Sequence, residues 1–259
     1  MDNMNNQIFT VSGLLAMLAM SALPVYAEQT PVKAIEPIKA EAELGVILTT
    51  GNTETASYKG KVTVKQDTES WSNKYLFDAL YKEDKLDSGA GEETTVTAEK
   101  YFVSTQGDYK LNNEHSALFI YGSYTDDRFS GFEYQSSVAV GYSDQLFGND
   151  VSFFNYNLGP GYTFNKSDQG VSDESFMVRV AMAYEYKLSE HAKFNQDIST
   201  ELVFEDESNA QSKSESAITA KLMGDLSLKV SYSVTHNSEV ADDKENMDTT
   251  TSVSVVYLF

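Results

Sequence analysis

The sequence offers few groups that could do covalent chemistry. It contains three histidines and no cysteine, which excludes thiolate nucleophiles, disulfides and Cys-ligated zinc. His115 and His191 lie in short segments typical of turns, where a solvated histidine needs no catalytic explanation. His236 is the remaining candidate, because it opens the run His236-Asn237-Ser238 near the end of a predicted strand.

A hydrolase built on His236 would need a serine within hydrogen-bond reach and a third group to orient the imidazole. Adjacent residues on a strand point to opposite faces, so Asn237 cannot orient His236 locally. A serine from a neighbouring strand, such as Ser252 or Ser254, could supply the nucleophile. An enzyme that modifies lipid or lipopolysaccharide is therefore one hypothesis for this chain.

Acidic residues gather in segments that we expect to be loops. Asp126-Asp127 is placed as in a peptidase-type barrel, but we prefer the interpretation that a charged loop pairs with its own Arg128. Hard divalent cations bind carboxylate oxygens, yet no loop has the ligand spacing of an EF-hand. We predict no cofactor, no dedicated metal site and at most weak binding of divalent cations. The candidate acidic rim comprises Glu83, Asp84, Asp87, Asp126, Asp127, Asp242, Asp243 and Glu245.

Composition narrows the class of protein further. The 259 residues include 19 Lys and Arg against 39 Asp and Glu, a formal charge of −20. That charge argues against nucleic acid as a partner, because a phosphate backbone is bound through an excess of Lys and Arg. A hydrophobic content of 41% is too high for a disordered acidic tail. Sixteen Tyr and 14 Phe against one Trp favour strands over helices.

The N-terminal segment has the pattern of an export signal. Residues 8–23 are an apolar run, and Val25-Tyr26-Ala27 follows with a suitable cleavage position after Ala27. A buried or anchoring helix is the alternative, although the run is shorter than the roughly 20 residues that a spanning helix needs. We therefore expect a signal peptide at 1–27, an N-terminal arm at 28–40 and a folded domain at 41–259.

From residue 41 onward, apolar and polar residues alternate with a period of two. The clearest case is the segment 226–235, where Leu226, Val230 and Val234 alternate with Ser227 and Lys229. Such alternation predicts strands with one apolar and one polar face. Pro160 within Gly159-Pro160-Gly161 predicts a break or bulge in one ladder, because proline donates no hydrogen bond. Twelve strands are predicted, at 40–50, 54–67, 70–83, 94–110, 115–126, 132–146, 151–165, 174–188, 192–205, 213–224, 226–238 and 248–259.

The connections alternate between short turns and mostly longer loops, as in an outer-membrane barrel. Most strands are about 11–15 residues long, enough to cross the ~25 Å apolar band at a tilt. Aromatic residues sit near strand ends, as in interfacial girdles. These features favour a transmembrane antiparallel up-and-down β-barrel, all-β, with its apolar face toward lipid and its charged face inside.

The polar faces of the predicted strands carry charges of both signs, as expected of a water-filled or salt-bridged lumen. Glu41, Glu43, Lys65 and Glu215 also lie on such faces but are not among the candidates. The candidate lumen-lining residues are Lys59, Lys61, Lys74, Asp78, Glu99, Glu133, Arg179, Asp197, Glu201, Lys221 and Lys229.

Several short motifs occur together along residues 41–259. They are Gly51-Asn52-Thr53, Asp127-Arg128-Phe129-Ser130-Gly131-Phe132 with Tyr134-Gln135, Gly159-Pro160-Gly161-Tyr162, Gln196-Asp197, Leu228-Lys229-Val230-Ser231-Tyr232 and His236-Asn237-Ser238. With the C-terminal strand they resemble the family of salt-induced outer membrane proteins, a domain of unknown function. The resemblance implies an outer-membrane barrel with no catalytic residues, and its name suggests a link to salt or osmotic conditions.

Three functions remain open. The leading hypothesis is a non-enzymatic barrel in a Gram-negative outer membrane, either a narrow channel for small ions or solutes or a structural barrel. The others are the His236 enzyme and an acidic-rim protein that binds cations or an envelope partner. We expect contact with outer-membrane lipid and lipopolysaccharide. The C-terminal strand ending in Phe259 resembles the signal read by the barrel assembly machinery.

Overall fold

The computed structural model describes residues 38–49, 54–87, 92–111, 115–204, 210–238 and 246–259. The expected signal peptide, most of the arm and the hairpin around Gly51-Asn52-Thr53 lie outside these ranges. No helix among the described residues is long and apolar enough to cross a membrane. The strands are β1 (Lys39–Thr49), β2 (Glu54–Asp67), β3 (Trp71–Asp87), β4 (Glu92–Lys110), β5 (Ser116–Asp127), β6 (Phe132–Gly148), β7 (Ser152–Ser167), β8 (Ser172–Lys187), β9 (Ala192–Val203), β10 (Ala210–Met223), β11 (Leu226–Asn237) and β12 (Met247–Leu258).

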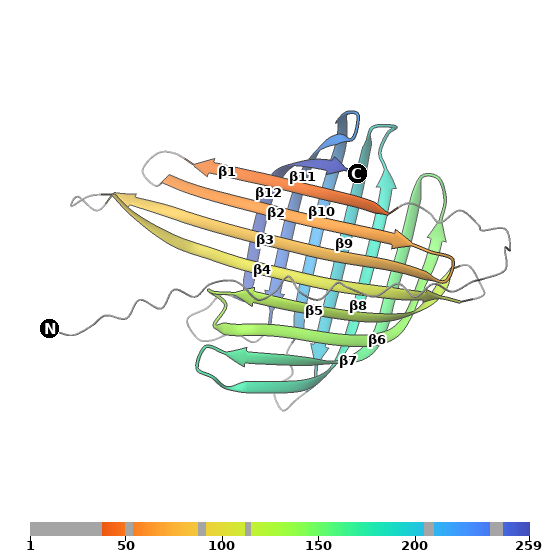
Figure 1. Cartoon of the computed structure of the whole chain (residues 1–259), viewed down its shortest axis with the longest axis horizontal. Coiled ribbons are helices and arrows are strands. Elements are labelled where there is room, and N and C mark those ends of the chain that lie inside the picture. The colour runs from red at the N-terminus through yellow and green to blue at the C-terminus, as the bar shows by residue number, and fades with distance from the viewer. Residues whose placement is uncertain (1–37, 50–53, 88–91, 112–114, 205–209, 239–245) are drawn as a thin grey trace, which may run out of the picture. The chain divides into compact units, whose positions relative to one another are not determined.

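The strands form one closed barrel (Figure 1). Each strand pairs antiparallel with the next along the chain, and β1 pairs with β12 to close the sheet. The predicted antiparallel up-and-down barrel of twelve strands is confirmed, and each strand end lies within four residues of its predicted position. We call the end where β1 begins and β12 finishes the termini end, and the opposite end the loop end.

The loops at the loop end are shorter than the sequence suggested, because the strands continue into them. β3 and β4 extend to Asp87 and from Glu92, so only residues 88–91 separate them. Only residues 128–131 and 168–171 separate the strands of the next two hairpins. Gly131 and Gly170 have φ values of +84° and +82°, which glycine adopts without the steric cost that a Cβ would bring.

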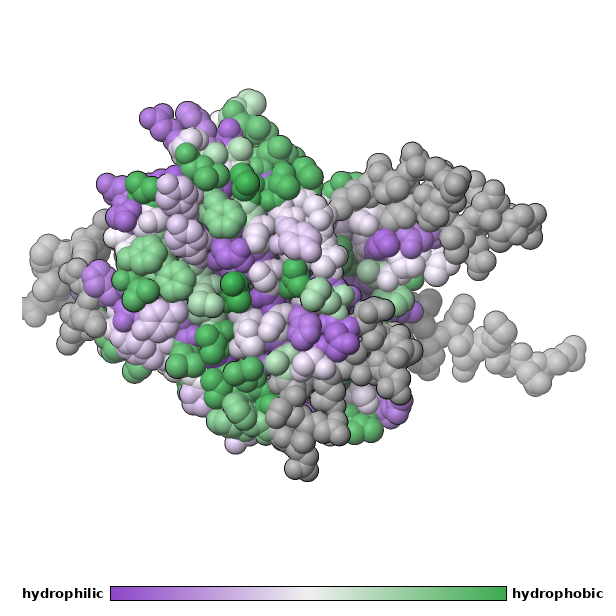
Figure 2. Space-filling view, turned by 180° about the vertical axis from the view of Figure 1, so that it is seen from behind, coloured by the Kyte–Doolittle hydropathy of each residue, from purple (hydrophilic) through white to green (hydrophobic). Residues whose placement is uncertain are grey.

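Large apolar side chains cover the outer face of the barrel wall. Leu44, Ile120, Val140 and Val253 are each at least half exposed in the isolated chain, as lipid-facing residues of a barrel are expected to be. Figure 2 shows such side chains in patches over one side of the barrel. The inward rows are polar or small, for example Ser231, Ser252 and Ser254, which are buried.

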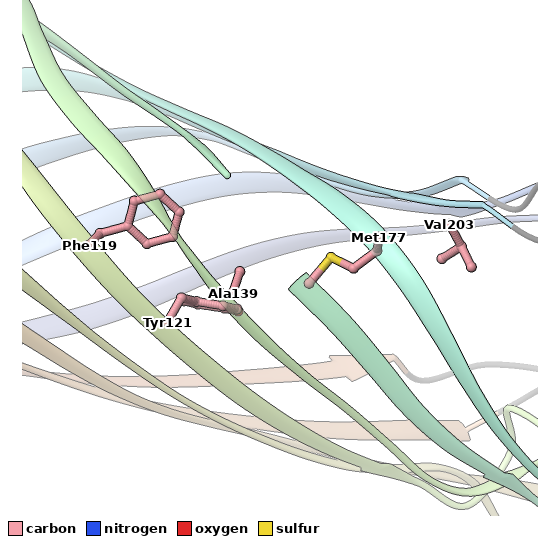
Figure 3. Close-up of a cluster of buried hydrophobic side chains, with 5 residues drawn as sticks. All are labelled: Phe119, Tyr121, Ala139, Met177 and Val203. Atoms are coloured by element: carbon pink, nitrogen blue, oxygen red, sulfur yellow. The ribbon is translucent and has the colours of Figure 1, made fainter. Parts of the chain in front are cut away.

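β5 has apolar residues on both faces, and its pairing decides between them. Leu118 and Ile120 point outward, while Phe119 and Tyr121 point into the barrel. Phe119 and Tyr121 join a buried cluster in the lumen. The cluster consists of Phe119, Tyr121, Ala139, Met177 and Val203, from β5, β6, β8 and β9 (Figure 3).

The Gly159-Pro160-Gly161 segment interrupts one ladder of β7, as predicted. β7 stays paired with β8 throughout, including Pro160 opposite Val178. Its described ladder with β6 has no pairs between Ala139↔Gly161 and Tyr142↔Leu158. A Cβ on Gly161 would lie 2.2 Å from the Val138 carbonyl oxygen and 2.7 Å from Met177 Cε. Glycine therefore makes room for two close-packed strands and for the lumenal cluster beside them.

We predict that a charge on the outer face is costly and that the same charge in the lumen is tolerated. Val103→Arg places a guanidinium on the lipid face of β4 and should destabilise the barrel by about 2–4 kcal/mol. Gln106→Arg, on the inward row of β4, keeps Asp108 as a partner, since Gln106 Nε2 lies 3.0 Å from Asp108 Oδ2. Urea titration of the lipid-folded protein, followed by fluorescence of the single tryptophan, Trp71, measures both.

An equal loss of stability in Val103→Arg and Gln106→Arg would contradict the assignment of the outer and inner faces of β4. Trp71 suits the readout because it lies on the outer face, 40% exposed, with its ring 5.3 Å from that of Tyr109.

Candidate functional site in the barrel lumen

A continuous chain of ion pairs crosses the inside of the barrel at the closing seam. Lys229 Nζ on β11 lies 2.9 Å from Glu43 Oε2 on β1 and 2.8 Å from Glu215 Oε1 on β10. Lys61 Nζ on β2 lies 3.1 Å from Glu215 Oε2, and Lys59 Nζ lies 3.8 Å from Glu43 Oε1. We call these five residues the ionic clamp, because they join both sides of the β1–β12 seam.

Small side chains on β12 allow the ionic clamp to form. The inward row of β12 carries Ser252 and Ser254, so no long side chain separates Lys229 from Glu43. Lys61 and Glu215 likewise meet although β1, β12 and β11 lie between their strands. Glu43 is only 1% exposed and Lys229 7%. Charges buried to this extent persist only when paired, and each has an opposite charge in contact.

A second charged group lies on the opposite part of the wall. Arg179 Nη1 donates to Glu201 Oε1 at 3.0 Å, and Ser137 Oγ donates to the same oxygen at 3.2 Å. The Arg179 guanidinium lies 3.7 Å from the centre of the Tyr121 ring, a cation–π contact. This ion pair therefore connects directly to the lumenal cluster of Figure 3.

Nine of the eleven candidate lumen-lining residues lie on inward rows of the barrel. Asp78 pairs in register with Lys61, and Asp197 pairs with Glu215, so both face the region of the ionic clamp. The nine are Lys59, Lys61, Lys74, Asp78, Arg179, Asp197, Glu201, Lys221 and Lys229.

Glu99 and Glu133 lie elsewhere. Glu99 and Lys100 are adjacent on β4, so only one of them can face the lumen. Lys100 does and pairs with Asp127 at 3.0 Å, while Glu99 is on the outer row opposite Tyr81 and pairs with Arg128 at 3.0 Å.

Glu133 lies at the loop end, where the register of β6 against β7 shifts between Phe132 and Tyr134. Its carboxylate is 55% exposed and pairs with Lys166 at 2.5 Å. The irregular pairing releases it from the strict alternation on which the sequence placement rested.

The candidate acidic rim is only partly described. Glu83, Asp84, Asp126 and Asp127 lie near the loop end, whereas the side chain of Asp87 and the residues Asp242, Asp243 and Glu245 lie outside the described part. Asp126 and Asp127 point to opposite faces of β5, so they do not form a paired-carboxylate site. No group of three or more His or acidic residues within the described ranges could hold a metal ion.

The structure does not assemble the hydrolase site considered for His236. His236 is on the outer row of β11, with Ser212 of β10 opposite it. Ser252 and Ser254 face inward and are buried, so both serines are on the other side of the barrel wall from His236. Ser212 makes its described side-chain contact with Thr200, at 3.1 Å.

Comparison with known proteins places the chain in a family. Residues 42–259 match the family described as "Protein of unknown function, DUF481". The chain belongs to this family. "Uncharacterized protein YdiY" of Escherichia coli K12 is 28% identical over 228 residues, 88% of this chain and 85% of that protein. The family recognised from the sequence motifs is thereby confirmed.

Solved barrels resemble this DUF481 chain only distantly. The NanC porin aligns with a TM-score of 0.47 and 10% identity, over 86% of this chain and 98% of that one. The translocator domain of the autotransporter NalP from Neisseria meningitidis aligns with a TM-score of 0.45 and 9% identity, over 85% and 86%.

Two residues of this DUF481 chain that the sequence did not single out, Glu43 and Glu215, are central to the ionic clamp. Periodicity placed both on polar faces, but alternation within a strand does not show which charges meet across intervening strands. Tyr121 was ambiguous for a related reason, since the apolar residues of β5 fit either face.

We predict that removal of the central cation is strongly destabilising. Lys229→Met leaves two buried carboxylates with weaker partners, so the free energy of unfolding should fall by about 3 kcal/mol. Arg128→Gln removes a cation whose side chain is 70% exposed and should change stability by less than about 1 kcal/mol. Urea midpoints from Trp71 fluorescence compare the two, and similar midpoints would contradict a structural role for the ionic clamp.

Proposed function

We propose that this protein is a non-enzymatic outer-membrane barrel whose charged lumen is a narrow, salt-sensitive pore for small ions and solutes. The observation that carries the proposal is the ionic clamp inside the wall, with Lys229 between Glu43 and Glu215. Paired charges of both signs can stabilise either cations or anions in the lumen, so they do not select strongly for one sign. Fixed side-chain pairs also narrow the passage that twelve strands enclose, which lies between the filled lumen of eight-stranded barrels and the open channel of large porins.

Salt sensitivity follows from the partial exposure of the Lys61–Glu215 pair in the ionic clamp. The screening length of an electrolyte falls from about 10 Å at 0.1 M to about 3 Å at 1 M. Glu215 and Lys61 are each 18–19% exposed, so dissolved ions reach this pair more readily than the more deeply buried Glu43. High salt should therefore loosen the Lys61–Glu215 contact first. This loosening at high salt is the physical basis that we propose for the link between the family and salt conditions.

The arrangement of residues favours a pore over an enzyme. His236 and the serines considered with it face opposite sides of the wall. The lumenal charges are committed to one another, as in Arg179–Glu201 at 3.0 Å. A general acid or base needs a partner on the substrate, whereas these groups already hold a partner within the barrel.

The barrel also has a defined orientation in this proposal. The termini end, with its short turns, lies in the periplasm of a Gram-negative cell, and the loop end faces outward among lipopolysaccharide. The C-terminal strand ends in Tyr257 and Phe259, whose rings are 4.7 Å apart. Phe259 is 71% exposed, so this aromatic end is accessible to the barrel assembly machinery.

We predict discrete conductance steps when the folded barrel is inserted into a planar lipid bilayer. Conductance divided by bulk conductivity should rise at least twofold between 0.1 M and 1 M KCl, because screening weakens the Lys61–Glu215 contact. In Glu215→Gln this normalised rise should disappear, since the pair is already lost. Arg128→Gln, which alters an exposed pair at the loop end, is the matched control and should behave like the unaltered protein.

Two results would overturn the proposal. A folded barrel that remains electrically silent at every salt concentration is not a pore. A normalised conductance that is constant with salt, in the presence of clear steps, would show that the ionic clamp does not control the width of the pore.

A further inference from the structure

The seam that closes the barrel is paired over only part of its length. β1 pairs with β2 over eleven residues, to Thr49↔Thr55, and β12 pairs with β11 over eleven residues, from His236↔Met247. The described ladder between β1 and β12 has five pairs, from Glu41↔Leu258 to Gly45↔Ser254. Beyond Gly45 and Ser254 the two strands run apart toward the loop end (Figure 1).

Separated strand edges are costly inside a membrane. Each unpaired backbone N–H or C=O in hydrocarbon costs several kcal/mol, so open sheet edges are not found facing lipid. β1 and β12 nevertheless remain regular strands through the region where they separate. In a membrane we therefore expect these edges to have a partner that presents polar groups to them.

Two buried polar atoms without hydrogen-bond partners lie in the last paired residues of the seam, before the strands separate. Ser254 Oγ and Glu43 Oε1 make no hydrogen bond to any described residue, although the residues are only 2% and 1% exposed. Buried polar groups are nearly always hydrogen-bonded. Lys59 lies 3.8 Å from Glu43 Oε1, close enough for attraction but beyond a hydrogen bond. A carboxylate oxygen and a hydroxyl thus remain available to a ligand.

The unpaired part of the seam is apolar on its outer side and polar on its inner side, as the binding site of an amphiphile would be. On its outer side, Val46 and Val253 lie directly beyond the last pair, next to the paired Leu44 and Val255, and all four are 45–71% exposed. Its inner side leads to Ser254 and to the ionic clamp. At Gly45 a Cβ would lie 2.9 Å from Ser254 Oγ, so glycine leaves room beside this hydroxyl that a side chain would fill.

We propose that the β1–β12 seam is a lateral portal that binds an amphiphile from the membrane, with its polar head at Ser254 and Glu43. The acyl chain lies outside along Leu44, Val46, Val253 and Val255. The head group carries hydrogen-bond donors, such as a primary ammonium, because Glu43 Oε1 can only accept. The portal goes beyond the proposed pore, since it connects the lumen to the surrounding leaflet rather than to the two aqueous sides.

Two lysophospholipids of equal acyl length test the choice of head group. Lysophosphatidylethanolamine has an ammonium with three donors, and lysophosphatidylcholine has a quaternary ammonium with none. Native mass spectrometry of the full-length folded barrel, released from a neutral detergent, counts the bound molecules. We expect one site with at least tenfold higher affinity for the ethanolamine lipid. Equal affinity for the two lipids would overturn the proposal.

A matched pair of serine variants tests the position of the site. Ser254→Val removes the hydroxyl without a hydrogen-bond partner and should weaken binding of the ethanolamine lipid about tenfold. Ser231→Val also removes a buried inward hydroxyl, but one that is 2.7 Å from Ser252 Oγ, and should leave binding unchanged. Equal effects in the two variants would contradict a site at the seam.

A cysteine pair across the seam gives a test that does not depend on Ser254. Val46 and Val253 would form the next pair after Gly45↔Ser254, and the chain contains no other cysteine. Oxidised Val46→Cys/Val253→Cys should lose lipid binding and regain it on reduction. Val234→Cys/Thr249→Cys bridges β11 and β12, which are paired at that position, and should bind normally.

The remaining outcomes are also decisive. A seam disulfide that forms fully and leaves lipid binding intact would overturn the portal. Failure of the seam pair to oxidise, while the control pair does, would support strand edges that stay apart. Bilayer conductance of the same variants separates the two proposals, because loss of lipid binding with unchanged conductance concerns the portal alone.

Discussion

The contact of Lys229 with both Glu43 and Glu215 is the constraint on which the barrel's closure depends. Among the described residues, β1 and β12 share five register pairs, so the backbone ladder contributes less to this seam than to the seams formed by hairpins. The ionic clamp adds side-chain contacts between β1 and β11 and between β2 and β10. These contacts lie at the level where β1 and β12 are still paired. Ion pairs between side chains in the lumen therefore accompany a short backbone ladder in the wall at the same seam.

The opposite wall uses a different kind of packing. Gly141 and Gly161 allow β6 and β7 to approach closely, and Phe119 and Met177 lie against the space that their missing side chains leave. Arg179 joins this apolar cluster to Glu201. The lumen thus has a wall of partly exposed ion pairs at the seam and, opposite it, an apolar cluster with the more deeply buried Arg179–Glu201 pair. Salt screens ion pairs but not apolar contacts, so a change in ionic strength should move the seam wall while the other stays in place.

Much of this architecture could be predicted from the sequence because its physical basis is local. Alternation of period two sets the strand bounds and the lipid face, and Pro160 marks an interrupted ladder. The exceptions arise where alternation is ambiguous or broken. Glu99 and Lys100 are adjacent charges of which only one can point inward, and Glu133 lies at a register shift. The ionic clamp joins residues up to 186 positions apart, and no local pattern reports which non-neighbouring strands exchange charges.

The incomplete seam could not be anticipated for the same reason. The outer row of β1 is as apolar as that of other strands, and β12 alternates cleanly to its end, so each strand alone predicts full pairing. What distinguishes this seam is that its strands come from opposite ends of the chain, without a hairpin to fix their register. Every other neighbouring pair is tied by a connection between consecutive strands. A barrel that must open at one place without unfolding would open where only side chains and a short ladder hold it.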